Sequence, residues 1–60
     1  MSSDELIKLL RANGWRKVSQ NGDHFTFKHP DNPLLITVTH PVKDMKKGLL
    51  HRILKIANLK

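Results

Sequence analysis

Two turn signals divide the middle of this chain into three short segments, and this pattern constrains the fold more than any other feature. Asn21-Gly22 is a strong hairpin signal because both residue types accept positive φ. Residues 30–33 (PDNP) form a second turn signal. The strands are expected at residues 15–20, 24–29 and 34–39, and the last two alternate apolar and polar side chains. A three-stranded antiparallel meander is therefore predicted.

Helical patterns flank the strands. The first helix is predicted at about residues 3–13, with a capping box formed by Ser2 and Glu5 and a stop at Asn13-Gly14. The second is predicted at about residues 45–57, with Asp44 as its cap and Gly48 packed closely against the sheet or open to the approach of a partner. Its expected buried stripe is Met45, Leu49, Leu50, Ile53, Leu54 and Ala57.

This order of elements predicts a single α+β domain, residues 1–60, with the order α-β-β-β-α and both helices on one face of the sheet. The buried sheet face would carry Phe25, Phe27, Ile36 and Val38. The other face has no helix left to cover it. It would carry His24, Thr26, Lys28, Thr37 and Thr39. His24 is one residue out of phase with the two phenylalanines, so it is expected on the open face.

Size and charge limit the possible functions. A domain of 60 residues is too small to enclose a deep cofactor pocket, so no cofactor is expected. There is no cysteine, no signal-peptide pattern and no apolar run of membrane-spanning length, so a cytoplasmic protein without a membrane contact is expected. The net charge of +6 favours a phosphate-backbone partner. The C-terminal 18 residues contribute Lys43, Lys46, Lys47, Arg52, Lys55 and Lys60 against Asp44.

His24 is the best candidate for chemistry. RNA carries its own nucleophile, the 2′-hydroxyl, so a protein needs only to remove that proton, hold the phosphate and neutralise charge. A histidine titrates near neutral pH and suits the first task. Gly22 would let the backbone approach a phosphate, and Lys28 would supply a cation. The alternative is an ordinary exposed histidine.

The other histidines are weaker candidates. His29 shares the phenylalanine face and is expected to pack there, although it could act as a general acid if the strand end twisted it outward. His40 precedes a proline at a strand exit and is expected to be structural. His51 lies on the polar side of the second helix, in a solvated role or in contact with a phosphate. A metal site from Asp23, His24, His29 and Asp31 has no supporting ligand spacing, so no metal is expected.

Four motifs, taken together, resemble the HicA toxins of bacterial HicAB toxin–antitoxin modules. They are SxELIKLLxxNGW, GxHFxFKHP, ITVxHP and KKGLLxxILKxAxL, in order from Ser3 to Leu59. The resemblance implies a fold like the double-stranded RNA-binding domain. It also implies an mRNA interferase, an endoribonuclease that cuts RNA without a required metal and inhibits translation and growth. His24 follows Gly22-Asp23, where the family has Gly-Ser-His, so the resemblance implies that His24 is catalytic.

The resemblance also implies a partner, the HicB antitoxin, which would cover the His24 face. Operator DNA would be bound only through the antitoxin complex. In this interpretation mRNA is the substrate, and Lys28, Lys46, Lys47 and Lys55 hold its phosphates. Two alternatives stay open from the residues alone. One is a non-catalytic RNA-binding module of the double-stranded RNA class. The other is an interaction module whose charge serves an acidic protein.

Overall fold

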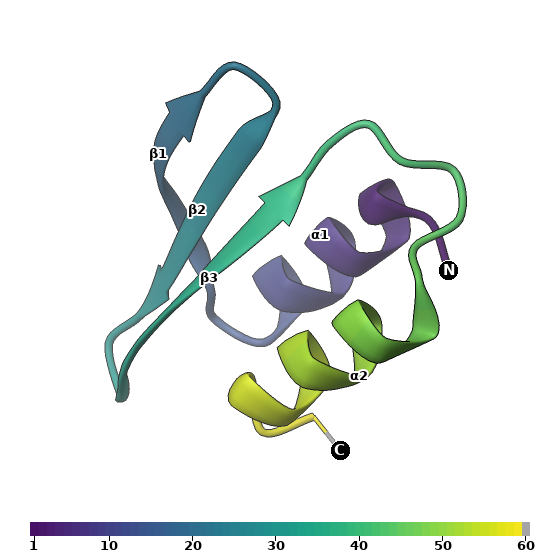
Figure 1. The fold of residues 1–60 in the computed structure, drawn as a ribbon. Coiled ribbons are helices and arrows are strands. Elements are labelled where there is room, and N and C mark those ends of the chain that lie inside the picture. Colours follow the sequence, from purple (N-terminus) through teal and green to yellow (C-terminus); the bar gives the residue numbers. More distant parts are fainter. Residues whose placement is uncertain (60) are drawn as a thin grey trace.

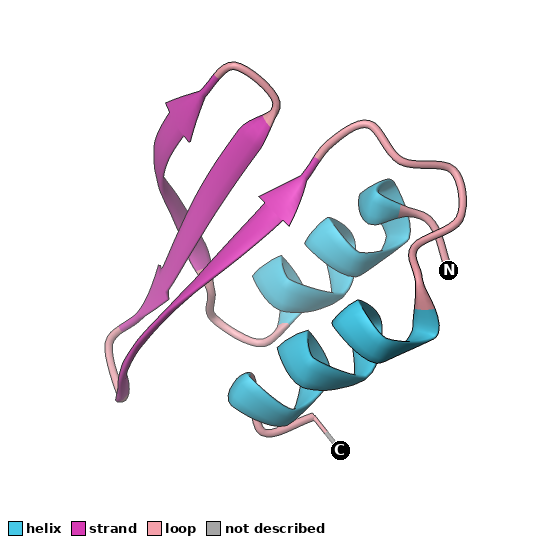
Figure 2. Cartoon of the chain, in the orientation of Figure 1, coloured by secondary structure: helices cyan, strands magenta, loops and turns pink. Residues whose placement is uncertain are grey.

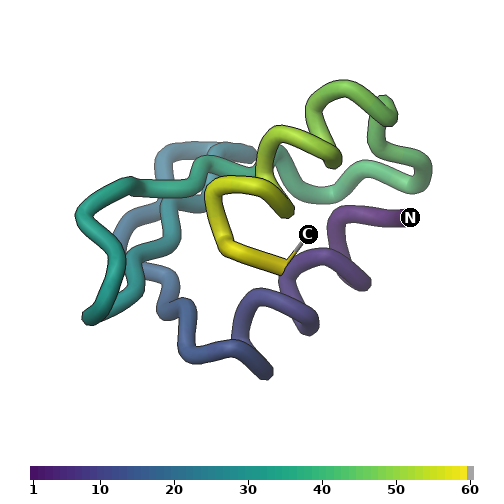
Figure 3. The backbone as a smooth tube through the Cα atoms, turned by 90° about the horizontal axis from the view of Figure 1, so that it is seen from below, coloured from purple at the N-terminus to yellow at the C-terminus, as the bar shows by residue number. Residues whose placement is uncertain are grey.

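Within residues 1–59, the part that the computed structural model describes, the chain forms a helix, three strands and a second helix. The elements are α1 (Ser3–Ala12), β1 (Arg16–Asn21), β2 (His24–His29), β3 (Asn32–Thr39) and α2 (Lys47–Ile56). The strands make one antiparallel sheet in the order β1-β2-β3. Both helices lie on the same side of this sheet (Figure 1, Figure 2). The backbone seen from below shows the strand segments to one side and the helical coils to the other (Figure 3). The predicted α+β architecture is confirmed.

The first hairpin turn lies one residue later than predicted. Asn21 pairs with His24, so Asn21 is the last residue of β1 and the two-residue loop is Gly22-Asp23. Only Gly22 in this turn has a positive φ, at 61°. A glycine with positive φ at the first loop position fits a type II′ turn, whose twist matches that of paired strands. Gly22 therefore fixes the register that begins at His24.

The second turn is also shorter than the PDNP signal suggested. His29 pairs with Asn32, which leaves Pro30-Asp31 as the loop. The last strand therefore begins at Asn32 and includes Pro33. Because β3 is at the edge of the sheet, a proline there costs no ladder hydrogen bond with a further strand.

Helix α1 begins as predicted and ends one residue earlier. The Ser2 hydroxyl accepts a hydrogen bond from the Glu5 amide, and the Glu5 carboxylate accepts one from the Ser2 amide, both at 3.1 Å. The helix ends at Ala12 with Asn13 as C-cap, and Gly14 follows with a φ of 91°. This left-handed residue reverses the chain toward β1.

The prediction that Asp44 caps the second helix is wrong. Helix α2 begins at Lys47, with Lys46 as N-cap and without a side-chain cap. Asp44 instead lies 3.7 Å from the N-terminal ammonium of Met1, and the Met45 amide donates to the Met1 carbonyl at 2.9 Å. Contacts with the N-terminus hold this segment in a non-helical form, so the helix starts two residues later than expected.

The core lies between the sheet and the helices. Its buried apolar residues are Leu6, Ile7, Leu10, Trp15, Phe27, Ile36, Val38, Met45, Ile53 and Ala57. Phe25 is only partly buried and packs against this cluster. Leu49 does not belong to the buried stripe, because 45% of its surface is exposed. With these exceptions, the alternation of the strands and the stripe of each helix face the core as predicted.

A hydrogen-bonded cluster joins the start of α1 to the end of the sheet. Ser3 is 1% exposed, and its amide donates to the Val42 carbonyl at 2.8 Å. The Ser3 hydroxyl accepts from the Val42 amide at 2.8 Å and lies 2.7 Å from Nδ1 of His40. The His40 amide donates to the Asp23 carbonyl at 2.9 Å. The cluster therefore fixes the turn that precedes His24.

Two glycines offer a matched test of this fold. An added Cβ at Gly14 would lie 2.8 Å from Nε2 of His29, in a backbone conformation that disfavours side chains. At Gly48 nothing lies within 4 Å, so the expectation of close packing there is wrong. We expect Gly14→Ala to lower the free energy of unfolding by about 1–3 kcal/mol. Gly48→Ala should leave it unchanged or raise it by up to about 1 kcal/mol.

Urea denaturation followed by circular dichroism measures both values. Equal stability of the two variants would contradict the fixed contact between Gly14 and His29.

Candidate nucleic-acid interface and its histidine

The uncovered face of the sheet carries a row of polar side chains around His24. His24 is the first residue of β2, the central strand, and is exposed. Its neighbours across the sheet are Asn21 on β1 and Thr39 on β3. Residues paired in this way place their side chains on the same face. The histidine therefore stands between an amide and a hydroxyl at one end of the open face, as the alternation predicted.

The His24 imidazole is available to a ligand. Among residues 1–59 no hydrogen bond or ion pair engages its side chain. The neighbouring carboxylate of Asp23 makes no hydrogen bond to it within the described part of the chain, and Asp23 acts instead through its carbonyl, which accepts from His40. An imidazole with both nitrogens open can accept a proton from a bound molecule.

The open face continues from His24 toward a pair of cations. The next row across the strands consists of Ser19, Thr26 and Thr37. Beyond it, Lys28 on β2 pairs with Arg16 on β1, and both are exposed. Lys28 comes four positions after His24 in the strand, a distance of about 13 Å. The face thus offers a histidine, a row of hydroxyls and two positive charges in sequence.

His29 and His40 are structural, and neither reaches this face. Nδ1 of His29 accepts from the Asp31 amide and Nε2 lies 3.0 Å from the Asn13 carbonyl, so the neutral ring carries its proton on Nε2. The same ring lies against Trp15, with centroids 5.3 Å apart. The His40 ring contacts Phe25 edge-on and bonds Ser3. The option that His29 serves as general acid on the open face is therefore wrong.

The predicted phosphate-binding residues fall into two groups. Gly22 and Lys28 lie on the open face or at its edge, together with His24. Lys46, Lys47 and Lys55 are exposed on α2 or at its cap, in the helical layer behind the sheet. The structure therefore does not bring these three lysines to His24. They form a separate basic surface.

The residues suggested for a metal site are also far apart in the fold. Asp23 and His24 lie at the start of β2, whereas His29 and Asp31 lie at its end. Among residues 1–59 no three histidine or acidic side chains gather in a way that could hold a metal ion.

Neither helix in this part of the chain is long and apolar enough to cross a bilayer.

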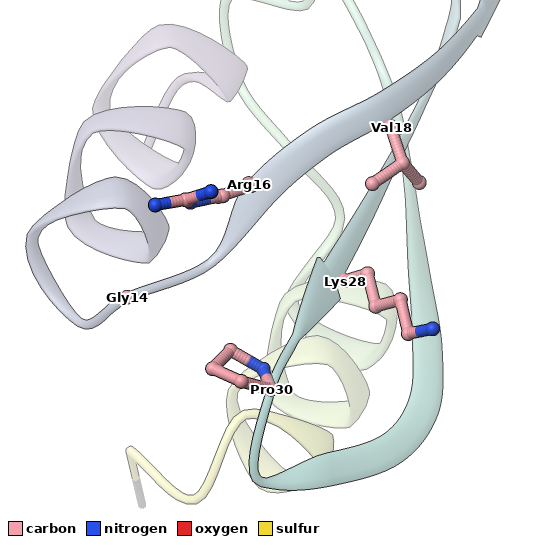
Figure 4. Close-up of a pocket in the computed structure, with 5 residues that line it drawn as sticks. All are labelled: Gly14, Arg16, Val18, Lys28 and Pro30. Carbon is pink, nitrogen blue, oxygen red and sulfur yellow. The ribbon is translucent and has the colours of Figure 1, made fainter.

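A hollow at the far end of the open face was missed by the sequence analysis. It has a volume of about 530 Å³ and is lined by Gly14, Arg16, Val18, Lys28 and Pro30 (Figure 4). Lys17 pairs with Phe27 and Ser19 with Thr26, so Val18 is an extra residue in β1. No sequence signal marks this bulge. It places both Arg16 and Ser19 on the open face. Strict alternation would have put these two side chains on opposite faces, because they are three residues apart.

Comparison with known proteins assigns the chain to a family. The family model described as the HicA toxin of bacterial toxin–antitoxin matches residues 3–59. A solved structure, described as the HicA3 and HicB3 toxin–antitoxin complex, contains a chain that is 39% identical, with a TM-score of 0.88. The match covers 100% of this chain and 97% of that chain. A comparison with curated proteins found no match. The motifs, the fold and these two matches agree, and the chain belongs to the HicA toxins of bacterial toxin–antitoxin systems.

Proposed function

We propose that this toxin is a metal-independent endoribonuclease, an mRNA interferase, with His24 as its catalytic residue. The observation that carries the proposal is the position of His24. It is an exposed imidazole without a protein partner among residues 1–59, at one end of an open sheet face that leads to two cations. Membership of the HicA family supports the same activity. Cleavage of mRNA in the cytoplasm would stop translation and growth.

The reaction follows from the chemistry of RNA. His24 accepts the proton of a ribose 2′-hydroxyl, and the resulting oxygen attacks the adjacent phosphorus. The bond from phosphorus to the 5′-oxygen breaks, which leaves a 2′,3′-cyclic phosphate and a 5′-hydroxyl. The departing oxygen needs one proton. Because the rings of His29 and His40 are held on the core side, we assign that proton to solvent water.

The phosphate contacts follow the two groups of cations. At the site, the Gly22 backbone approaches the RNA, since nothing lies within 4 Å of the position where its Cβ would be. Lys28 holds a phosphate on the same face. Lys46, Lys47 and Lys55 hold phosphates further along the RNA, where the strand passes α2. These lysines also raise the local concentration of RNA, because a basic surface attracts a polyanion over several ångströms.

Removal of the imidazole tests the catalytic role. We expect His24→Ala to lower the rate at which a long unstructured RNA is cleaved in EDTA by at least about 100-fold, because general base catalysis contributes a factor of this size to the rate. RNA affinity should change little, since the variant keeps all the cations. The native protein should give 2′,3′-cyclic phosphate ends on a denaturing gel. Lys8→Gln, on the exposed side of α1 and purified in parallel, should cleave as the native protein does.

Equal cleavage by the native protein and His24→Ala would move the chemistry to another group. Binding without cleavage by either protein would leave the runner-up function, an RNA-binding module without activity.

We propose that a HicB antitoxin neutralises the toxin by covering the His24 face. The similar solved structure is described as a toxin–antitoxin complex, which supports a partner of this kind. The open face is the side of the sheet that residues 1–59 leave uncovered, and the proposed catalytic group lies on it. An antitoxin there would exclude RNA directly. Operator DNA would be bound through the antitoxin complex and not by the toxin alone.

Chemical modification of histidines tests this placement. We expect diethylpyrocarbonate to modify His24 in the free toxin, since its side chain is exposed. With the HicB antitoxin bound at equal concentration, His24 should react at least about tenfold more slowly, while the rate at His51 on α2 stays at its value in the free toxin. Mass spectrometry of peptides measures both rates. Undiminished modification of His24 in the complex would place the antitoxin elsewhere.

A further inference from the structure

We propose that the hollow beside the β1 bulge is a subsite for one nucleotide of single-stranded RNA, on the same face as His24 but remote from the cut. It is lined by Gly14, Arg16, Val18, Lys28 and Pro30. The proposal rests on the proposed function for the identity of the ligand. We call this feature the bulge hollow.

The two cations of the bulge hollow are placed at a cost to the fold. Arg16 and Lys28 are directly paired across β1 and β2, and like charges in this position destabilise a sheet. Neither forms an ion pair within residues 1–59, where the pairs are Met1 with Asp44 and Lys8 with Asp4. No acidic residue lines the bulge hollow. Anions bound beside the two side chains would offset their positive charges, so the pair favours a phosphate-bearing ligand.

The walls of the bulge hollow suit the uncharged part of a nucleotide. Val18 is 56% exposed, although it is apolar and belongs to a strand. Pro30 presents a second apolar wall, and Gly14 also lines the hollow. A base or ribose that packs on Val18 and Pro30 would remove this apolar surface from water. Apolar walls with a few charged groups are typical of sites that fix one part of a ligand.

The direction of the two cations indicates how the nucleotide lies. Figure 4 shows the Arg16 and Lys28 side chains extending to opposite sides of the hollow. They cannot clamp one phosphate in this arrangement, but they can meet the phosphates on either side of one nucleotide. The RNA strand would then cross from β1 to β2 with its base or sugar on Val18. An unpaired strand fits this path, because a base in a duplex is stacked on its neighbours and cannot enter a hollow.

The distance between His24 and the bulge hollow determines how many nucleotides lie between the cut and the subsite. Ser19, Thr26 and Thr37 lie between the two positions and offer hydroxyl groups along the path. A separation of about 13 Å corresponds to roughly four nucleotides at the stacked rise of about 3.4 Å, and to fewer in an extended strand. The bulge hollow therefore lies within one short RNA segment of the cut. It would act on the affinity and specificity of cleavage, not on the chemical step.

Binding measurements in the His24→Ala background test the subsite without depending on cleavage. We expect Arg16→Gln to weaken binding of a single-stranded RNA about tenfold at low salt, as for the loss of one charge-assisted contact. It should also reduce the slope of log K against log salt by about 0.7, the value for one phosphate of a single strand. Val18→Asp, which puts a carboxylate in the hollow, should weaken binding at least as much. Arg11→Gln is the control, because Arg11 is an exposed residue of α1 and its replacement removes the same charge.

Circular dichroism and thermal unfolding confirm that each variant is folded. Equal affinities and salt slopes for Arg16→Gln and Arg11→Gln would overturn the subsite, even if the native toxin cleaves RNA. Loss of binding in Arg16→Gln would support the subsite even if the native protein does not cleave, in which case the endonuclease proposal alone fails. No binding of RNA by any of these proteins would overturn both.

Discussion

The register of the β1–β2 hairpin is the constraint on which the rest of this structure depends. Side chains alternate along a strand, so a shift of one residue would exchange the two faces of β2. Phe27 is completely buried, and this burial leaves His24, three residues earlier, on the other face. Gly22, with its positive φ, sets the turn from which this register starts. Core packing and exposure of the proposed catalytic group therefore have the same origin.

Sequence reasoning predicted the faces of the central β2 residues and of the buried β3 residues more reliably than it predicted the ends of the elements. The alternation of Phe25, Phe27, Ile36 and Val38 places them on the helix side, since a half-covered sheet has one apolar face. The start of α2 could not be predicted, because Asp44 is a good cap by type but is used by the N-terminus. Contacts between distant residues decided that boundary, and the local sequence pattern around Asp44 gives no information about such contacts.

The same contrast between local signals and distant contacts explains which features of the site could be predicted. The exposure of His24 follows from local alternation. The bulge at Val18 depends on how β1 pairs with β2, and the position of the α2 lysines depends on where the helix packs. The roles of the His29 and His40 rings depend on the Asn13 carbonyl and on the Ser3 hydroxyl, and both of these groups lie far from the histidines along the chain. Two histidines of this small domain thus fix loops, and His24 is exposed without a hydrogen-bond partner among residues 1–59.

We propose above all that RNA lies on the open sheet face, with the cut at His24. Amide NMR spectra of ¹⁵N-labelled His24→Ala protein, titrated with a short single-stranded RNA, test it most directly. We predict that the largest shifts follow the face from Asn21 through Thr26 to Lys28, and that the buried side of α1 changes little. Shifts confined to α2, with the open face unchanged, would contradict it. The RNA would then bind the basic helix, and His24 would not be placed to cut it.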